Sequence, residues 1–213
     1  QKISLKVQDQ KDTTVYLIKY FGSKLFYADT AEMKNGLVVF DGAKQKPGIV
    51  GLFLPGQRYF EFVYNNEDIL LETKGPDFMA NMVIKKSEEN KVFIPYVKFI
   101  SSKKADIAKL SEERGKLKPE DAQYKALSTQ IEALNKEVDA YQANLIASNP
   151  TRLVSKIVKM SMEVVVPESP KDANGKIIDS AYNYKYYFAH YWDNVDFKTD
   201  ALVNNPIFAN KLE

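Results

Sequence analysis

The only histidine and the only tryptophan of the chain, His190 and Trp192, lie in an aromatic stretch that spans residues 181–197. Imidazole can serve as a general base, and aromatic rings can stack on a ligand. A general base needs an orienting group and a nearby nucleophile. Asp193 lies three residues after His190, but such pairs occur on many helices. His190 alone therefore does not predict a catalytic site.

Other reactive groups are sparse in the sequence. The chain has no cysteine, which removes disulfides, thiolate metal sites and thiol nucleophiles. With one histidine, a zinc site would need carboxylates almost exclusively, which is uncommon. No GxSxG, HExxH, P-loop or GxGxxG motif is present. The pairs Glu88-Glu89 and Glu112-Glu113 fall on expected helices and are interpreted as solvated. The sequence thus predicts no catalytic residue, no cofactor and no metal site.

Composition indicates a globular protein. Of the 213 residues, 45% are apolar, and 30 basic side chains nearly balance 28 acidic ones. A net charge of +2 argues against a dedicated nucleic-acid surface, because such surfaces usually carry a strong basic excess. The sequence also lacks the roughly 18 consecutive apolar residues that a membrane-spanning helix needs. Because the chain opens with Gln1, we expect it to be part of a longer protein.

Residues 1–86 are predicted to form an antiparallel β domain. Apolar and polar residues alternate in short runs, and Gly, Pro and Asn residues separate the runs. Such spacing is typical of a β-sandwich or an open barrel, which gives an α+β fold for the whole chain. The expected strands are 3–7, 15–20, 24–28, 37–40, 48–54, 59–64, 69–72 and 82–85. No helical segment long enough for a crossover separates them, so parallel pairing is not expected.

Residues 87–213 are predicted to form a helical domain, with Ser87 as the first helix cap and Pro95 as a kink or delayed start. A hairpin is expected over about 88–148, with Pro119 opening its second helix. That helix carries an apolar seam with alternating spacings of three and four residues: Tyr124, Leu127, Ile131, Leu134, Val138, Tyr141 and Leu145. The hairpin either projects from the body or lies on the sheet. Its seam pairs either within one chain or between two chains, which would give a homodimer.

Further helices are expected near 150–163, with Asn149 as cap, and near 180–192. In the second of these, Tyr184, Tyr187, Phe188 and Tyr191 share one face. Aromatic helices usually pack, so this face is predicted to be buried. Tyr182, Tyr186 and His190 lie on another face.

Four stretches in order along the chain resemble one family. They are YFGSK with DTA (20–24 and 29–31), GIVGLFLPGQRYFEF (48–62), SEEN with Phe93 (87–90), and HYWDN with PIFANKL (190–194 and 206–212). Together they are similar to the N-terminal region of secreted, TlpA-type, thioredoxin-like thiol-disulfide oxidoreductases. In that family a β domain and a helical region, both of unknown function, precede a thioredoxin domain. The chain departs from the pattern by ending at Glu213 and by a longer hairpin over 103–145.

The resemblance implies that a catalytic Cys-x-x-Cys lies downstream and that no catalytic residue transfers to this chain. It implies a location in the periplasm or cell envelope, with membrane attachment through a preceding segment left open. The partner would be a downstream thioredoxin domain or its protein substrate, and Tyr182, Tyr186, His190 and Trp192 are the candidate docking surface. Alternatively, Trp192 packs beneath the β domain. The competing functional hypothesis is a non-redox binding or scaffold module for a protein or glycan.

Overall fold

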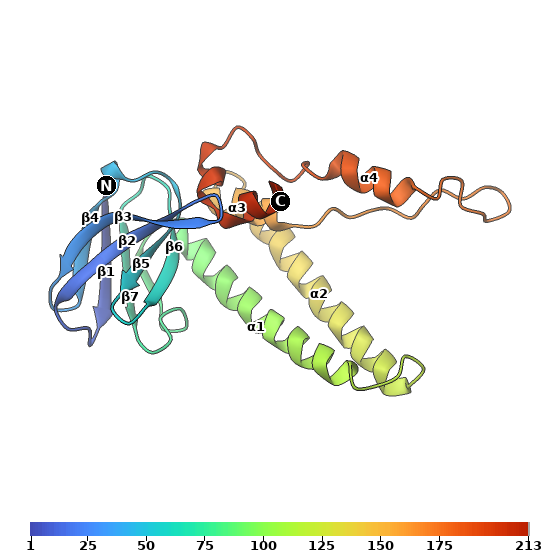
Figure 1. Ribbon diagram of the computed structural model, residues 1–213, viewed down its shortest axis with the longest axis horizontal. Coiled ribbons are helices and arrows are strands. Elements are labelled where there is room, and N and C mark those ends of the chain that lie inside the picture. Colours follow the sequence, from blue (N-terminus) through green and yellow to red (C-terminus); the bar gives the residue numbers. More distant parts are fainter. Residues whose placement is uncertain (213) are drawn as a thin grey trace.

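A computed structural model describes residues 1–212 and contains a β-sandwich followed by helices (Figure 1). Two four-stranded sheets have the orders β4-β1-β7-β8 and β3-β2-β5-β6, and neither closes into a barrel. Their strands are β1 (Lys2–Gln8), β2 (Thr13–Phe21), β3 (Lys24–Met33), β4 (Leu37–Asp41), β5 (Gly48–Leu54), β6 (Arg58–Tyr64), β7 (Ile69–Lys74) and β8 (Val83–Lys86). The predicted α+β class and all eight predicted strands are confirmed.

One strand pair differs from the antiparallel expectation. β1 runs parallel to β7, with Ile3 opposite Ile69 and Leu5 opposite Leu71, whereas every other named pair is antiparallel. Parallel neighbours need a long connection, which is commonly a helix. Here the five strands β2–β6 form that connection, so the parallel pair arises without a crossover helix.

The core lies between the two sheets and continues into the helices. Alternation places the inward residues of each strand in this core, and the most deeply buried include Leu5, Leu17, Leu52, Phe62 and Leu71. Helix α3 (Leu153–Ser161) adds Leu153, Val154, Ile157, Val158 and Met160 to the same apolar cluster. The β region and α3 therefore share one core. The division into domains at residues 86 and 87 stays a prediction.

Helices α1 (Asn90–Arg114) and α2 (Ala122–Ser148) form the predicted hairpin, which projects from the body (Figure 1). The seam of α2 packs on α1 within the chain. Leu127, Ile131 and Leu145 are buried there, and the rings of Phe99 and Tyr141 stack with centroids 4.1 Å apart. Two basic residues of α1 also have partners on α2: Lys103 pairs with Glu137, and Arg114 lies over the ring of Tyr124.

Three predicted helix features need correction. Pro119 does not open α2, which begins at Ala122 after a turn in which Asp121 accepts a hydrogen bond from the Lys118 amide at 3.0 Å. Asn149 ends α2 instead of capping α3, and its side chain donates to the Leu145 carbonyl at 2.9 Å. Pro95 lies inside α1, so of the two expectations for it the delayed start is wrong, and the kink stays a prediction. Local contacts therefore set the start of α2 and the end of α2, whereas the start of α3 is held by a distant residue, Glu89.

The remainder of the chain leaves the body and returns to it. After α3, the chain runs outward to a turn at residues 172–176, and α4 (Tyr182–His190) lies on the limb that returns from this turn (Figure 1). The chain then comes back through the 3₁₀ segment η2 (Asp200–Asn204) to α5 (Pro206–Leu212), and η2 contacts β2, β5 and α3. We call residues 162–198 the arm. No helix within residues 1–212 has the length and hydropathy to cross a membrane.

Candidate docking cleft and aromatic arm

The SEEN stretch forms a buried junction between the sheet and two helices. Asn90 is fully buried, and its side-chain amide accepts from the Val63 amide at 2.8 Å and donates to the Val63 carbonyl at 2.7 Å. Ser87 accepts from the Asn90 amide at 2.9 Å, which confirms Ser87 as a cap. Asn90 thus satisfies the backbone at the open edge of β6, where a missing partner would be costly.

Glu89 corrects the expectation of a solvated carboxylate pair. It is only 3% exposed, and its two oxygens accept from the amides of Leu153 at 3.1 Å and Val154 at 2.9 Å, at the start of α3. A carboxylate is favoured there because helix N-termini carry unpaired amides and a partial positive charge. Glu88, by contrast, is exposed and pairs with Lys91 and Arg152, as expected for a solvated residue. We call Ser87–Asn90 the junction.

The turn that links β2 to β3 meets the returning chain at η2. The Gly22 amide donates to the Val203 carbonyl at 3.1 Å. Nearby, Asn204 donates to the Pro47 carbonyl at 2.8 Å and packs on Gly48. A Cβ at Gly48 would lie 2.5 Å from that of Asn204, and the φ of +152° also favours glycine. Two turns of the β region therefore hold η2 in place.

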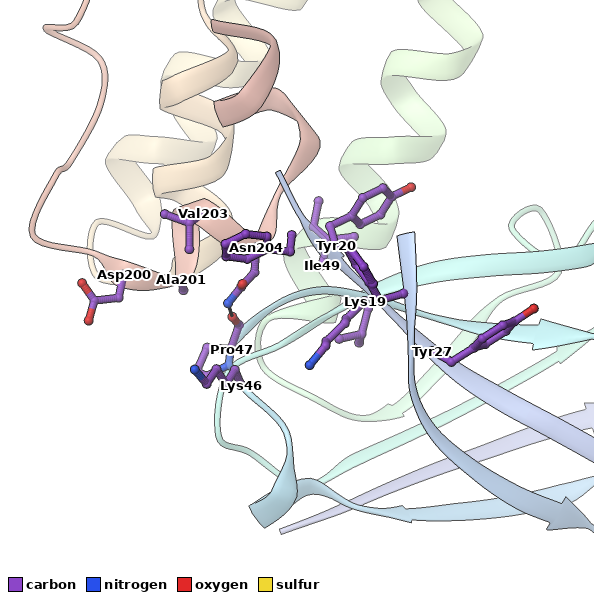
Figure 2. Close-up of a pocket in the computed structure, with 13 residues that line it drawn as sticks. Lys19, Tyr20, Tyr27, Lys46, Pro47, Ile49, Asp200, Ala201, Val203 and Asn204 are labelled. Carbon is purple, nitrogen blue, oxygen red and sulfur yellow. Dashed lines mark hydrogen bonds between the residues drawn. The ribbon is translucent and has the colours of Figure 1, made fainter. Parts of the chain in front are cut away.

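An open cleft of about 820 Å³ lies between η2 and strands β2, β3 and β5. Figure 2 shows the η2 residues on one side of this cleft and the strand residues on the other. Its lining is mainly apolar, and Phe26 and Tyr27 on β3 are 45% and 67% exposed. We call this the β3–η2 cleft. Its size is within the range of clefts that bind ligands or peptide side chains.

The charged groups of the cleft are mostly basic. Lys19 and Lys46 line it with Asp200, and within residues 1–212 none of the three has an ion-pair partner within 4.0 Å. Tyr20 donates a hydrogen bond to Glu61, and burial followed by this bond raises the pKa of Tyr20 above its ordinary value. The phenol therefore stays neutral. A cleft of this kind suits an apolar segment with an acidic flank.

The predicted docking residues on α4 form a ladder along one helix face. The rings of Tyr182 and Tyr186 lie 5.9 Å apart, and that of His190 lies 4.1 Å from Tyr186. His190 Nδ1 is 2.6 Å from an Asp193 oxygen. All three rings are partly exposed. Residues 1–212 contain no cluster of metal-ligand residues.

The expectation of a buried aromatic face on α4 is wrong. The helix has no buried residue, and Tyr184 and Phe188 are 66% and 62% exposed. The reason is tertiary, since the arm carries α4 away from the body (Figure 1). Tyr187 and Tyr191 are partly covered, by each other and, for Tyr191, by Lys211.

Trp192 does not continue the ladder. Its indole is part of an aromatic cluster at the end of the arm with Tyr191, Phe197 and Phe208 on α5, at centroid distances of 5.0–6.4 Å. It is partly buried against the main core. The structure thus separates Trp192 from Tyr182, Tyr186 and His190. Its ring neighbours lie at the C-terminal segment, and the alternative position beneath the β region stays a prediction.

Comparison with known proteins gives one match. Residues 1–93 match the family model described as "Domain of unknown function (DUF4369)". The match covers the sandwich and reaches the first turn of α1, including the junction. No curated protein and no solved structure matches the chain. The matched part is therefore similar to a known domain type, and nothing in these comparisons connects it with TlpA or thioredoxin-like proteins.

Sequence reasoning missed the cleft, although a signal for it was available. Leu25, Phe26 and Tyr27 are three consecutive large apolar residues on a strand whose neighbours alternate. A strand with one buried face cannot bury all three, so at least one must be exposed or contact another segment. The contribution of Lys46 and η2 could not be foreseen, because they lie far from β3 in the sequence.

Proposed function

We propose that this chain is a non-catalytic accessory region that docks a protein partner, and that the β3–η2 cleft is the docking site. The observation that carries the proposal is the exposed ring of Phe26 in the mainly apolar lining of a cleft of about 820 Å³. Aromatic anchors in a pocket often dominate binding energy at protein interfaces. Lys19 and Lys46, which have no ion-pair partner among the described residues, add a preference for acidic partner segments.

The partner we propose is a thioredoxin-like domain, or the protein substrate of such a domain, in the cell envelope. The resemblance of four ordered stretches to the region that precedes the thioredoxin domain in TlpA-type proteins supports this choice. Three of those stretches contribute residues near the cleft or at the junction. Gly22 and Gly48 contact η2, and Glu89 belongs to the junction. In this role the chain would act by proximity, because tethering raises the effective concentration of a partner to the millimolar range for short linkers.

The reading frame of the parent gene gives the first test. A Cys-x-x-Cys motif within about one domain length beyond residue 213 supports the redox assignment. A frame without such a motif contradicts it and favours the scaffold hypothesis instead. The chain alone should not reduce insulin disulfides, since thiol–disulfide exchange needs a thiolate and the chain has no cysteine.

Binding gives the second test. The downstream domain would be expressed separately and titrated with this chain by calorimetry. Phe26→Ser and Lys46→Glu each alter the cleft, and we expect each to weaken binding about tenfold, as loss of an anchor does. Phe188→Ser is the matched control, because it removes an exposed ring from the arm. Equal effects of Phe26→Ser and Phe188→Ser, or no effect of either cleft variant, would refute the cleft as the docking site.

A further inference from the structure

We propose that two copies of this chain associate through β3, whose free edges pair antiparallel to join the two β3-β2-β5-β6 sheets. β3 is the longest strand, with 10 residues, and it is an edge strand. Unpaired edges with apolar side chains are templates for pairing with another strand. This inference does not depend on the proposed function.

The other sheet edges are less suited to pairing. The edge of β6 is occupied at one position, because Asn90 bonds the amide and carbonyl of Val63. The edge strands of the other sheet, β4 and β8, have five and four residues. On β3, the stretch Lys24–Tyr27 consists of four consecutive exposed residues, and β2 is its only partner strand in the described chain. The long free edge therefore coincides with exposed apolar side chains.

A register shift in β3 places Lys24 and Asp29 on one face. Phe26 lies opposite Lys19 on β2, and Asp29 lies opposite Leu17, with the irregularity of a β-bulge between them. Directly opposed residues of antiparallel strands point to the same face, and Lys19 and Leu17 share a face of β2. Phe26 and Asp29 therefore share that face, and alternation adds Lys24 to it.

The charges of β3 favour a second copy as the occupant of its edge. Antiparallel pairing centred on Phe26 sets Leu25 of each copy opposite Tyr27 of the other. It also places Lys24 of each copy next to the β-bulge of the other copy. Asp29 adjoins this bulge and lies on the same face of the sheet as Lys24. The charged and apolar residues of β3 thus complement those of a second, antiparallel β3, as a two-fold symmetric contact requires.

Side chains on both faces of β3 are compatible with this pairing. One face borders the β3–η2 cleft, and the other borders a smaller hollow of about 180 Å³ that is lined also by Phe53 and Tyr59. When the two-fold axis is perpendicular to the sheet, the corresponding faces of the two copies lie on the same side of the joined sheet. The apolar residues of the second copy would therefore extend both apolar surfaces. Asp29 also accepts from the Thr30 amide at 2.8 Å, which limits pairing to the first half of β3.

Charge reversal gives a sharp test by sedimentation velocity over a range of concentrations. We expect the wild-type chain to show a concentration-dependent dimer. Lys24→Glu brings two carboxylates together at each contact, and Asp29→Lys brings two ammonium groups together. Each variant alone should therefore associate about tenfold more weakly. In an equimolar mixture opposite charges meet again at both contacts, so the mixture should regain the wild-type association constant as a heterodimer.

Two controls complete the design. Lys11→Glu makes the same charge change as Lys24→Glu on an exposed loop and should leave the dimer unchanged. Phe188→Ser tests whether the exposed arm is the true contact, and it should also leave the dimer unchanged. A wild-type chain that remains monomeric at all concentrations would overturn the proposal. So would a dimer that persists in both β3 variants or that is lost in Phe188→Ser.

Discussion

The junction and the arm are two places where polar and aromatic side chains are densely grouped, and they are used in opposite ways. At the junction, Glu89 and Asn90 are buried, and both side chains have backbone partners. On the arm, Tyr184 and Phe188 are mostly exposed, and their ring centroids lie 4.6 Å apart. Burial with full hydrogen bonding stabilises a fold, whereas exposed rings are available for contacts between molecules. The first region should control stability, and the second should not.

The largest expected effect is that of Asn90→Ala. This change leaves the amide and carbonyl of Val63 without partners in a buried place, and we expect a loss of about 2–4 kcal/mol in the free energy of unfolding. Chemical denaturation monitored by circular dichroism measures this loss. Asn183→Ala on the arm is the matched control, because Asn183 is exposed and its side chain bonds that of Ser169. Similar losses of unfolding free energy in Asn90→Ala and Asn183→Ala would contradict the conclusion that the junction, and not the arm, controls stability.

Glu89→Gln should have the next largest effect. Glutamine offers one acceptor oxygen where glutamate offers two, so an α3 amide loses its partner and the charge at the helix start disappears. We expect a loss of about 1–2 kcal/mol in the free energy of unfolding. Glu88→Gln, at the neighbouring exposed carboxylate, should cost less. A thermal unfolding series compares the two variants, and a larger effect of Glu88→Gln would show that the junction is wrongly described.

The pKa of Asp196 tests how the arm is fastened to the body. Hydrogen bonds from Thr199 and Lys156, and one from the Lys198 amide, lower this pKa from 3.8 to about 2. Because the folded pKa lies below the ordinary value, the contact stabilises the folded chain above that value and is lost as pH falls toward 2. Lys156→Met should raise the pKa measured by NMR titration. A pKa near 3.8 in the wild-type chain would contradict this contact.

Phe188→Ser should have the smallest effect on stability. The ring is 62% exposed and its aromatic neighbours lie on the arm, so the free energy of unfolding should change by less than about 0.5 kcal/mol. The same denaturation experiment measures it. The fluorescence of Trp192 gives a second readout, since its neighbours Phe197 and Phe208 are unaffected by this change. A large loss of stability would mean that α4 packs on the body.

Residues 1–86 were predicted well because their strands are short and carry a clear alternation. The turns also followed local rules, as at Asn35-Gly36, where both residues have positive φ. The seam of α2 was predicted for the same reason, since its spacing reflects a single packed face. The prediction failed for α4, because its sequence pattern is compatible with both a buried and an exposed helix. The aromatic residues of α4 have helical spacing in either case, and spacing does not show whether another element covers them.

The sequence by itself determined the α+β class, the eight strands, the helical hairpin and the absence of any thiol chemistry in this chain. Those properties depend on residue type and on neighbours within a few positions. Only the tertiary structure decided that Glu89 is buried at the start of α3, that β1 lies parallel to β7, and that η2 closes one side of a cleft. The physical reason is that each of these contacts joins segments far apart in the sequence. Their meeting depends on the packing of the whole chain.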